Sequence, residues 1–269
     1  MIVDFHTHIF PDKIAKQTIS LLESHTNGKA FTDGTETGLI KNMEKVGVDL
    51  SITLPVLTKP TQFDSVTKYA MGINQKYADS SRRIISFAGM HPECDDIAGK
   101  MKFLKDNGFL GVKIHPDYQN CYINHQGYIT ILNLARELDM IVVTHSGVDD
   151  GYAGLPIKCP PILCAEVIKK TKHKKFVLGH YGAHRQWQET LEILSDFDVY
   201  FDTALAYRSI DEKLFKDILK RHGEDKILFA TDCPWGDIEK DLQVLYSYNL
   251  DKNVLDKILY KNALKLLNI

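Results

Sequence analysis

The chain has 269 residues, of which 44% are hydrophobic and 25% are charged, and its formal net charge is −2 at pH 7. This composition is typical of a globular protein with a substantial core. The small net charge gives no reason to expect nucleic acid or an anionic membrane as a partner. No apolar run is long enough for a membrane helix, and no basic segment followed by an apolar one marks a secretory signal peptide.

Cysteine use indicates a reducing compartment. The five cysteines are an odd number, and they are widely spaced in a chain long enough to fold without disulfide bonds. No Cys-x-x-Cys pair suggests a structural zinc site. We therefore expect reduced thiols in a cytoplasmic protein. The cysteines are Cys94, Cys121, Cys159, Cys164 and Cys233.

Short apolar runs rich in β-branched residues alternate with longer stretches of helical periodicity. Most of the runs are continuous rather than alternating, which is typical of parallel strands covered on both faces. The predicted strands are 2–5, 50–56, 84–90, 110–114, 140–144, 176–179, 199–202 and 227–231. The predicted helices are 37–46, 63–78, 97–107, 127–138, 162–170, 187–194, 212–221, 238–246 and 253–267.

Eight strand–helix units without a Pro-, Gly- or Ser-rich linker predict one α/β domain over residues 1–269. The expected fold is a (β/α)8 TIM barrel with extra C-terminal helices. Gly108 and Gly223 lie where helix C-caps are expected. The alternative is an open doubly wound sheet, but its usual Gly-rich loop after the first strand is missing.

Metal-binding residue types lie at the ends of the predicted strands, where the chemistry of such barrels gathers. His6 and His8 are two residues apart, so in a strand they point to the same face. That pair is a weak signal alone, because a chain with 11 histidines nearly supplies one by chance. Its weight comes from the residues at the other strand ends, which are His91, Lys113, His115, His145, His180 and Asp232.

Imidazole nitrogens with one carboxylate are the ligands of a catalytic zinc ion, which leaves a position open to water. His6, His8, His145 and Asp232 would converge over the mouth of the barrel. Bound water ionises near neutral pH, and a nearby carboxylate can take its proton and pass it to a leaving group. The sequence therefore predicts one zinc ion, or another divalent metal, with a further histidine available to polarise the substrate.

The chain resembles the amidohydrolase superfamily, in particular the branch that holds aminocarboxymuconate semialdehyde decarboxylase and several aromatic-acid decarboxylases. The resemblance rests on the opening His-x-His motif, the strand order and the Thr-Asp-Cys-Pro motif after the eighth strand, and it covers almost the whole chain. It implies that His6 and His8 are strand-1 ligands, His145 the strand-5 ligand and Asp232 the strand-8 ligand. It also implies that His180 acts on the substrate.

The fourth predicted strand leaves the number of metals open. Some binuclear members of the superfamily bridge two metals with a carbamylated lysine on this strand. Lys113 and His115 share one face, so either could serve a second metal. Alternatively, Lys113 binds a substrate carboxylate or supports His115.

Aromatic and arginine residues near the later strand ends suit a small carboxylate-bearing substrate. Arg185, Tyr181 and Trp235 are the main candidates, and Tyr152, Trp187, Tyr207 and Arg208 lie nearby. His184 could line the same pocket, while His91 is expected to be structural. We expect the remaining histidines at the surface: His25, His125, His173 and His222.

These features favour a zinc-dependent hydrolase of a small-molecule amide or lactone. Metal-activated water would attack the carbonyl, Asp232 would act as general base and acid, and His180 would polarise the substrate. The alternative is a non-oxidative zinc-dependent decarboxylase of a small aromatic or unsaturated carboxylic acid. A third hypothesis is a metal-binding regulator built on a catalytically inactive barrel. The presence of both Asp232 and His180 argues against it. A homodimer is the default expectation from the resemblance.

Overall fold

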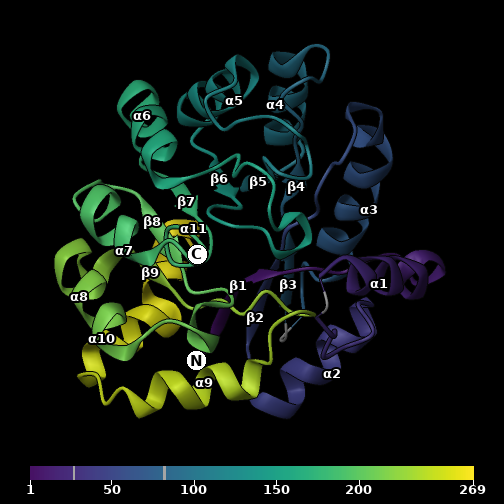
Figure 1. Ribbon diagram of the computed structural model, residues 1–269. Helices are drawn as coiled ribbons and strands as arrows, with labels where there is room; N and C mark the ends of the chain where they lie inside the picture. The colour runs from purple at the N-terminus through teal and green to yellow at the C-terminus, as the bar shows by residue number, and fades with distance from the viewer. Residues whose placement is uncertain (27, 81–82) are drawn as a thin grey trace.

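The computed structural model describes residues 1–26, 28–80 and 83–269. Its strands are short, buried and surrounded by helices (Figure 1). They are β1 (Val3–Thr7), β2 (Leu50–Thr53), β3 (Arg83–Ser86), β4 (Ala88–Gly89), β5 (Gly111–Ile114), β6 (Ile141–Thr144), β7 (Phe176–Leu178), β8 (Tyr200–Asp202) and β9 (Ile227–Leu228).

All neighbouring strands are parallel, in the orders β1-β2-β3 and β4-β5-β6-β7-β8-β9. β3 and β4 together correspond to the predicted third strand, which is interrupted at Phe87. The ladder continues across this break, because the Phe87 amide donates to Thr53 O at 2.9 Å and the Met90 amide donates to Lys113 O at 2.9 Å.

Backbone hydrogen bonds also join β1 to the segment that follows β9. The Phe5 amide donates to Phe229 O at 2.9 Å, and the Asp232 amide donates to His6 O at 2.8 Å. The buried Asp4 carboxylate accepts from the Thr231 hydroxyl at 2.6 Å. The first and last strands are therefore neighbours, which confirms the (β/α)8 TIM-barrel prediction.

The helices pack around the strands, and most of the predicted helices are present (Figure 1). They are α1 (Asp12–Thr26), α2 (Glu36–Val46), α3 (Phe63–Lys76), α4 (Ile97–Asp106), α5 (Gln126–Glu137), α6 (Pro161–Thr171), α7 (Trp187–Glu189), α8 (Glu212–His222), α9 (Ile238–Ser247), α10 (Lys252–Asp256) and α11 (Asn262–Leu267). Two π-helical turns, at Thr190–Leu194 and Lys257–Lys261, extend α7 and join α10 to α11.

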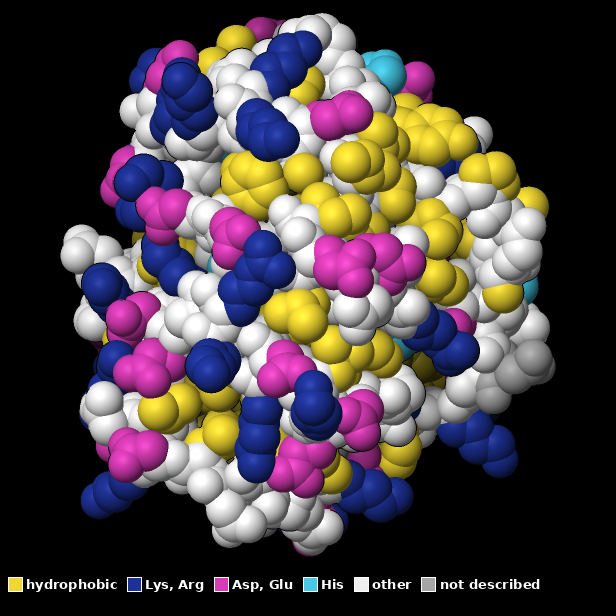
Figure 2. All heavy atoms as spheres, turned by 60° about the vertical axis from the view of Figure 1, so that its left-hand side comes forward, with side chains coloured by type: hydrophobic (Ala, Val, Ile, Leu, Met, Phe, Trp, Pro, Cys, Tyr) yellow, Lys and Arg dark blue, Asp and Glu magenta, His cyan; other side chains and the backbone are white. Residues whose placement is uncertain are grey.

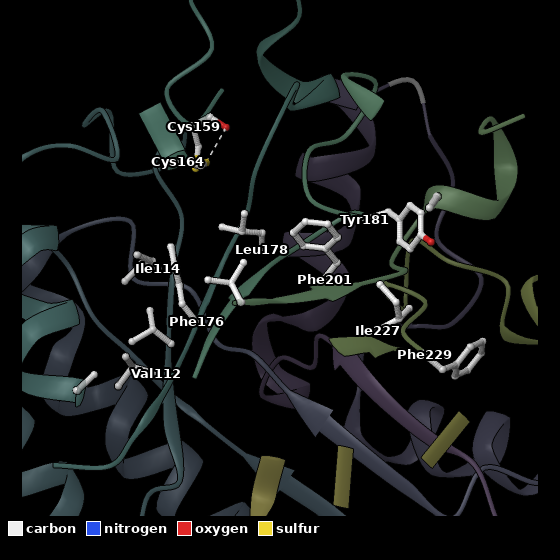
Figure 3. Packing of buried hydrophobic residues seen from close by; sticks show 14 of the residues in the cluster. Val112, Ile114, Cys159, Cys164, Phe176, Leu178, Tyr181, Phe201, Ile227 and Phe229 are labelled. Atoms are coloured by element: carbon white, nitrogen blue, oxygen red, sulfur yellow. Dashed lines mark hydrogen bonds between the residues drawn. The ribbon is translucent and has the colours of Figure 1, made fainter. Parts of the chain in front are cut away.

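Alternating strand residues divide the core into two clusters. Val112 and Ile114 of β5 pack outward against the helices, in the large cluster that Figure 3 shows. Val3, Ile52 and Val143 belong to a second cluster, which fills the inside of the barrel together with residues of α11. Lys113 lies between Val112 and Ile114 in β5, so its side chain points inward.

Acidic and basic side chains are interspersed on the face that Figure 2 shows, so this face has no large patch of a single type of charge. Among the described residues, no helix is both long enough and apolar enough to cross a membrane.

Candidate active site

Three side chains from the two ends of the chain form the first group of metal-ligand type. The ligand atoms of His6, His8 and Asp232 lie within 4.8 Å of one another. Asp232 Oδ1 is 3.4 Å from His6 Nε2 and 3.0 Å from His8 Nε2. His6 is on β1, His8 follows it, and Asp232 follows β9, so barrel closure brings the three together.

Hydrogen bonds at the far side of each imidazole determine which nitrogen carries the proton. His6 Nδ1 donates to Asp202 Oδ2 at 2.9 Å, and His8 Nδ1 donates to Leu54 O at 2.8 Å. Because these partners can only accept, Nδ1 carries a proton in both rings, and Nε2 is the nitrogen that can bind a cation. Both Nε2 atoms face the Asp232 carboxylate.

The charge states of this group fit a divalent cation. Burial lowers the pKa of His8. Burial alone would raise the pKa of Asp232, but its contacts with His6 and His8 hold that pKa well below its usual range. Two imidazole lone pairs and an ionised carboxylate at 3.0–3.4 Å repel one another unless a proton or a cation lies between them. This donor set is the one that zinc and similar ions prefer.

A second group of metal-ligand type consists of His115, His145 and Asp149, whose ligand atoms also lie within 4.8 Å of one another. His115 Nε2 is 3.5 Å from Asp149 Oδ2. The His115 and His145 rings are stacked, with centroids 4.5 Å apart and planes at 12°. His145, predicted as a ligand of the first metal, is thus grouped with different partners here.

His180 lies between the two groups. Its ring centroid is 5.3 Å from that of His6 and 4.5 Å from that of His145. His180 Nδ1 donates to Ala204 O at 3.1 Å, and burial lowers the pKa of His180 to about 3. The ring is therefore neutral, with its lone pair on Nε2. His180 and Asp232 both have a positive φ, at 59° and 67°, a strained conformation that is common at functional sites.

Lys113 lies beside the first group. Its ammonium nitrogen is 3.0 Å from His6 Nε2 and its side chain is buried. Burial lowers the pKa of Lys113 to about 8, although the carboxylates of Asp202 and Asp232 oppose this shift.

The predicted substrate residues have different positions. Tyr181 is fully buried, its hydroxyl donates to Phe215 O at 3.1 Å, and its ring stacks on that of Phe215, so it belongs to the outer core (Figure 3). Arg185 is exposed and pairs with Asp150 at 2.9 Å. Trp235 is half-buried, and its carbonyl accepts from the exposed Arg208 side chain.

The other aromatic candidates and His184 also divide between core and loops. Tyr207 is buried, while Tyr152 is partly exposed. Trp187 is buried, and its Nε1 donates to His180 O at 3.0 Å, so it supports the backbone of His180. His184 is buried, with its ring 5.6 Å from that of His180.

Two predictions about the remaining histidines were wrong. His173 is buried, and His222 is half-buried between the carbonyls of Ser195 and Val199 at 3.1 and 3.0 Å. His25 and His125 are exposed as expected. His91 is buried, and its Nδ1 accepts from the Glu93 amide at 3.2 Å, which is a structural role.

Two aspartates of the site had no role in the sequence analysis. Asp202 ends β8 and holds His6, and Asp149 lies in the loop after β6. The signal for Asp202 was available, because it closes a predicted strand at the same edge as the other ligands. Asp149 is five residues beyond β6 in an irregular loop, and no periodicity marks it.

Comparison with known proteins identifies the family of the chain. The family described as amidohydrolase matches residues 3–269. None of the curated protein sequences matches the chain.

Solved structures share the fold at low identity. An uncharacterised TIM-barrel protein from Bordetella bronchiseptica is 12% identical with a TM-score of 0.77, covering 99% of this chain and 98% of that one. A 5-carboxyvanillate decarboxylase from Novosphingobium aromaticivorans, complexed with manganese, is 14% identical with a TM-score of 0.72, over 100% and 96%. A probable 2-pyrone-4,6-dicarboxylic acid hydrolase from Acinetobacter baumannii is 16% identical with a TM-score of 0.70, over 100% and 99%.

The family match spans the His-x-His pair, the closing aspartate and every strand between them. The chain belongs to the amidohydrolase family.

Proposed function

We propose that the chain is a metal-dependent hydrolase that cleaves an amide or a lactone of a small molecule, using a divalent cation held by His6, His8 and Asp232. The observation that carries this proposal is the convergence of two imidazole lone pairs on an ionised carboxylate. When bound, such a cation polarises a carbonyl group and lowers the pKa of water. Zinc is the first choice, and manganese is the second because a structural neighbour binds it.

His180 is the proton acceptor in this proposal. Its Nδ1–H is committed to Ala204 O, so Nε2 offers a lone pair to the attacking water. Polarising a substrate carbonyl, the role expected from the sequence, requires a proton on Nε2. We therefore assign His180 the transfer of a proton from water to the leaving group. Asp232, which is ionised and adjacent, is the second proton acceptor.

The substrate in this proposal is a small carboxylate. Lys113 is the buried cation nearest to the first group, and Arg185 lies at the mouth on an exposed loop. Either side chain can pair with a substrate carboxylate. The named substrates of two structural neighbours, carboxyvanillate and pyrone dicarboxylate, are also small carboxylates.

The second candidate is a non-oxidative decarboxylase of a small aromatic or unsaturated acid. It is favoured by the manganese-bound decarboxylase among the structural neighbours. The same cation would then hold the substrate carboxylate, and a protonated group would deliver a proton to carbon.

The experiment that separates the two is product analysis. Protein loaded with zinc or manganese is incubated with lactones, amides and aromatic acids, and products are followed by NMR together with released CO2. Ring opening or amide cleavage without CO2 supports the hydrolase, and CO2 without hydrolysis contradicts it. His180→Ala should lower kcat about 10²–10⁴-fold at unchanged metal content, whereas His25→Ala, an exposed control, should have no effect.

A further inference from the structure

We propose that His184 is a further catalytic residue, whose Nδ1–H donates a hydrogen bond to the substrate oxygen on which negative charge develops. The inference rests on the proposed hydrolysis, and it assigns the donor that His180 cannot supply. The Nδ1–H of His180 is donated to Ala204 O at 3.1 Å, so its Nε2 offers a lone pair and no proton. The substrate carbonyl therefore needs a donor from another side chain.

Arg185 determines which nitrogen of His184 carries the proton. Arg185 Nε donates to His184 Nε2 at 3.3 Å. A guanidinium group has donors and no acceptor, so Nε2 keeps its lone pair and the ring proton is on Nδ1. Asp150 Oδ2 is 3.7 Å from His184 Nε2, which is too far for a hydrogen bond that would move the proton there.

The Nδ1–H of His184 has no acceptor within the described part of the chain. The side chain is buried, and Nδ1 has no hydrogen-bond partner among the described residues. Buried N–H groups are nearly always paired, and an unpaired one requires an explanation such as a catalytic role. A substrate oxygen would supply the missing acceptor.

The surroundings of His184 hold this donor beside the proposed proton acceptor. The His184 ring is 5.6 Å from the ring of His180, and the Trp187 ring meets it edge to face at 5.7 Å. Two backbone hydrogen bonds fix the residue against the loop after β6: its amide donates to Ser146 O at 2.8 Å, and its carbonyl accepts from the Val148 amide at 3.0 Å. The donor is therefore held in place before the substrate binds.

The two histidines have complementary roles in this proposal. His180 accepts the proton of the attacking water at Nε2, whereas His184 keeps its proton and donates it in a hydrogen bond. As water adds to the carbonyl, the carbonyl oxygen becomes an oxyanion, and a donor to that atom strengthens its bond as the charge grows. Such a donor lowers the barrier more than it strengthens substrate binding.

Binding of phenylphosphonate tests the proposal without turnover, because its tetrahedral anionic group resembles the product of water addition to a carbonyl. Its Kd is measured by calorimetry for zinc-loaded native protein and variants. His184→Phe keeps an aromatic ring and loses the donor, so Kd should rise about 10–100-fold, the effect of losing a hydrogen bond to a charged group. In His184→Asn the side-chain amide can donate from the position of Nδ1, so the affinity should stay near the native value. His25→Phe, an exposed control, should bind like the native protein.

Hydrolysis of dihydrocoumarin, a small aromatic lactone, tests the same donor during the reaction. His184→Phe should lower kcat about 10²–10³-fold, as the loss of one oxyanion donor does, with little change in KM. His184→Asn should recover most of this loss, which a merely structural role of the ring would not allow. Long-range 1H–15N NMR of the imidazole rings identifies the protonated nitrogen, and we expect Nδ1 in His184.

Three results would each overturn the role of His184. They are a neutral His184 ring with its proton on Nε2, a phenylphosphonate Kd that is the same in native protein and His184→Phe (including no binding by either), and an unchanged kcat in His184→Phe. If the native protein hydrolyses no lactone or amide while His184→Phe still weakens phenylphosphonate binding, the proposed hydrolysis is wrong and the anion donor stands. Lactone hydrolysis that His184→Phe leaves unchanged, together with its phosphonate affinity, refutes the donor alone.

Discussion

Asp202 holds two histidines of the candidate site through the two oxygens of its carboxylate. Oδ2 accepts from His6 Nδ1 at 2.9 Å, and Oδ1 accepts from the His180 amide at 3.0 Å. Burial alone would raise the pKa of Asp202, but the hydrogen bond from His6 and the neighbouring His180 and Lys113 side chains lower it below the usual value. An ionised carboxylate behind an imidazole fixes the ring orientation and makes Nε2 a better metal ligand.

Asp202→Asn should therefore weaken cation binding about 10–100-fold, the usual effect of losing such a partner. Competition between the protein and a chelating dye measures this affinity directly. Asp198→Asn is the matched control, because Asp198 lies just before β8 at the surface, where it pairs with Lys174 and Lys226. An unchanged affinity in folded Asp202→Asn would show that the His6 ring is oriented by other contacts.

The sequence predicted that His6, His8 and Asp232 lie together, but it also placed His145 with them and gave Asp149 no role. His6, His8 and Asp232 could be found because each follows a strand, and strand order determines which strand ends meet. Asp149 could not, because its position depends on the loop after β6. Gly147 there has φ 85°, and its amide donates to Cys159 O at 2.9 Å. Such tertiary contacts leave no periodic signal.

At the level of elements, the strands were predicted more completely than the helices. α1 was missed because its apolar residues do not form a buried stripe: Ala15 is buried, whereas Ile14 and Leu21 are 42% and 55% exposed. This helix contacts the 3-10 turn Asp150–Tyr152 of the loop that carries Asp149. Hydrophobic periodicity detects helices that cover strands, and α1 packs on a loop.

The end of β7 requires glycine. A Cβ at Gly179 would lie 2.8 Å from Thr144 O, a backbone atom of the neighbouring strand, and 3.5 Å from His6 Cε1. Gly179→Ala should lower the free energy of unfolding by about 1–3 kcal/mol, as overpacking does, and should also weaken cation binding by shifting His6. Urea denaturation and the dye competition measure the two effects.

Gly72→Ala is the matched control for that substitution. Gly72 is inside α3, and a Cβ there has no neighbour within 4 Å. Alanine loses less backbone entropy on folding than glycine, so this variant should gain about 0.5–1 kcal/mol. If Gly179→Ala is as stable as the native chain, β6 and β7 can shift apart to accommodate the added Cβ without a loss in the free energy of unfolding.

For the whole molecule, the barrel could be predicted because eight strand–helix units follow one another without interruption. The burial of individual residues between elements could not. His173 lies in the short connection between α6 and β7, a polar stretch with five lysines between residues 169 and 175, and its sequence context indicates an exposed position. Its side chain is nevertheless buried in the folded chain, at 3% exposure, near the backbone of Met140 and the side chain of Arg136.

The burial of His173 predicts a contribution to acid unfolding. Burial lowers the pKa of His173 from 6.5 to about 4, so between these values the unfolded chain binds a proton that the folded protein does not. Folding stability from this residue is complete above pH 6.5 and falls as the pH decreases toward 4. The loss reaches at most about 3 kcal/mol, since each pKa unit corresponds to about 1.4 kcal/mol.

His173→Gln removes this proton and should make the stability of the protein less dependent on pH. Urea denaturation of both proteins at intervals from pH 7 to pH 4, with a chelator present throughout, gives the two stability curves. The free energy of unfolding of the native protein minus that of His173→Gln should decrease steadily as the pH decreases, whatever its value at pH 7. His25→Gln, at an exposed position, should parallel the native curve. Parallel curves for His173→Gln would mean that His173 is protonated in the folded protein as readily as in the unfolded chain.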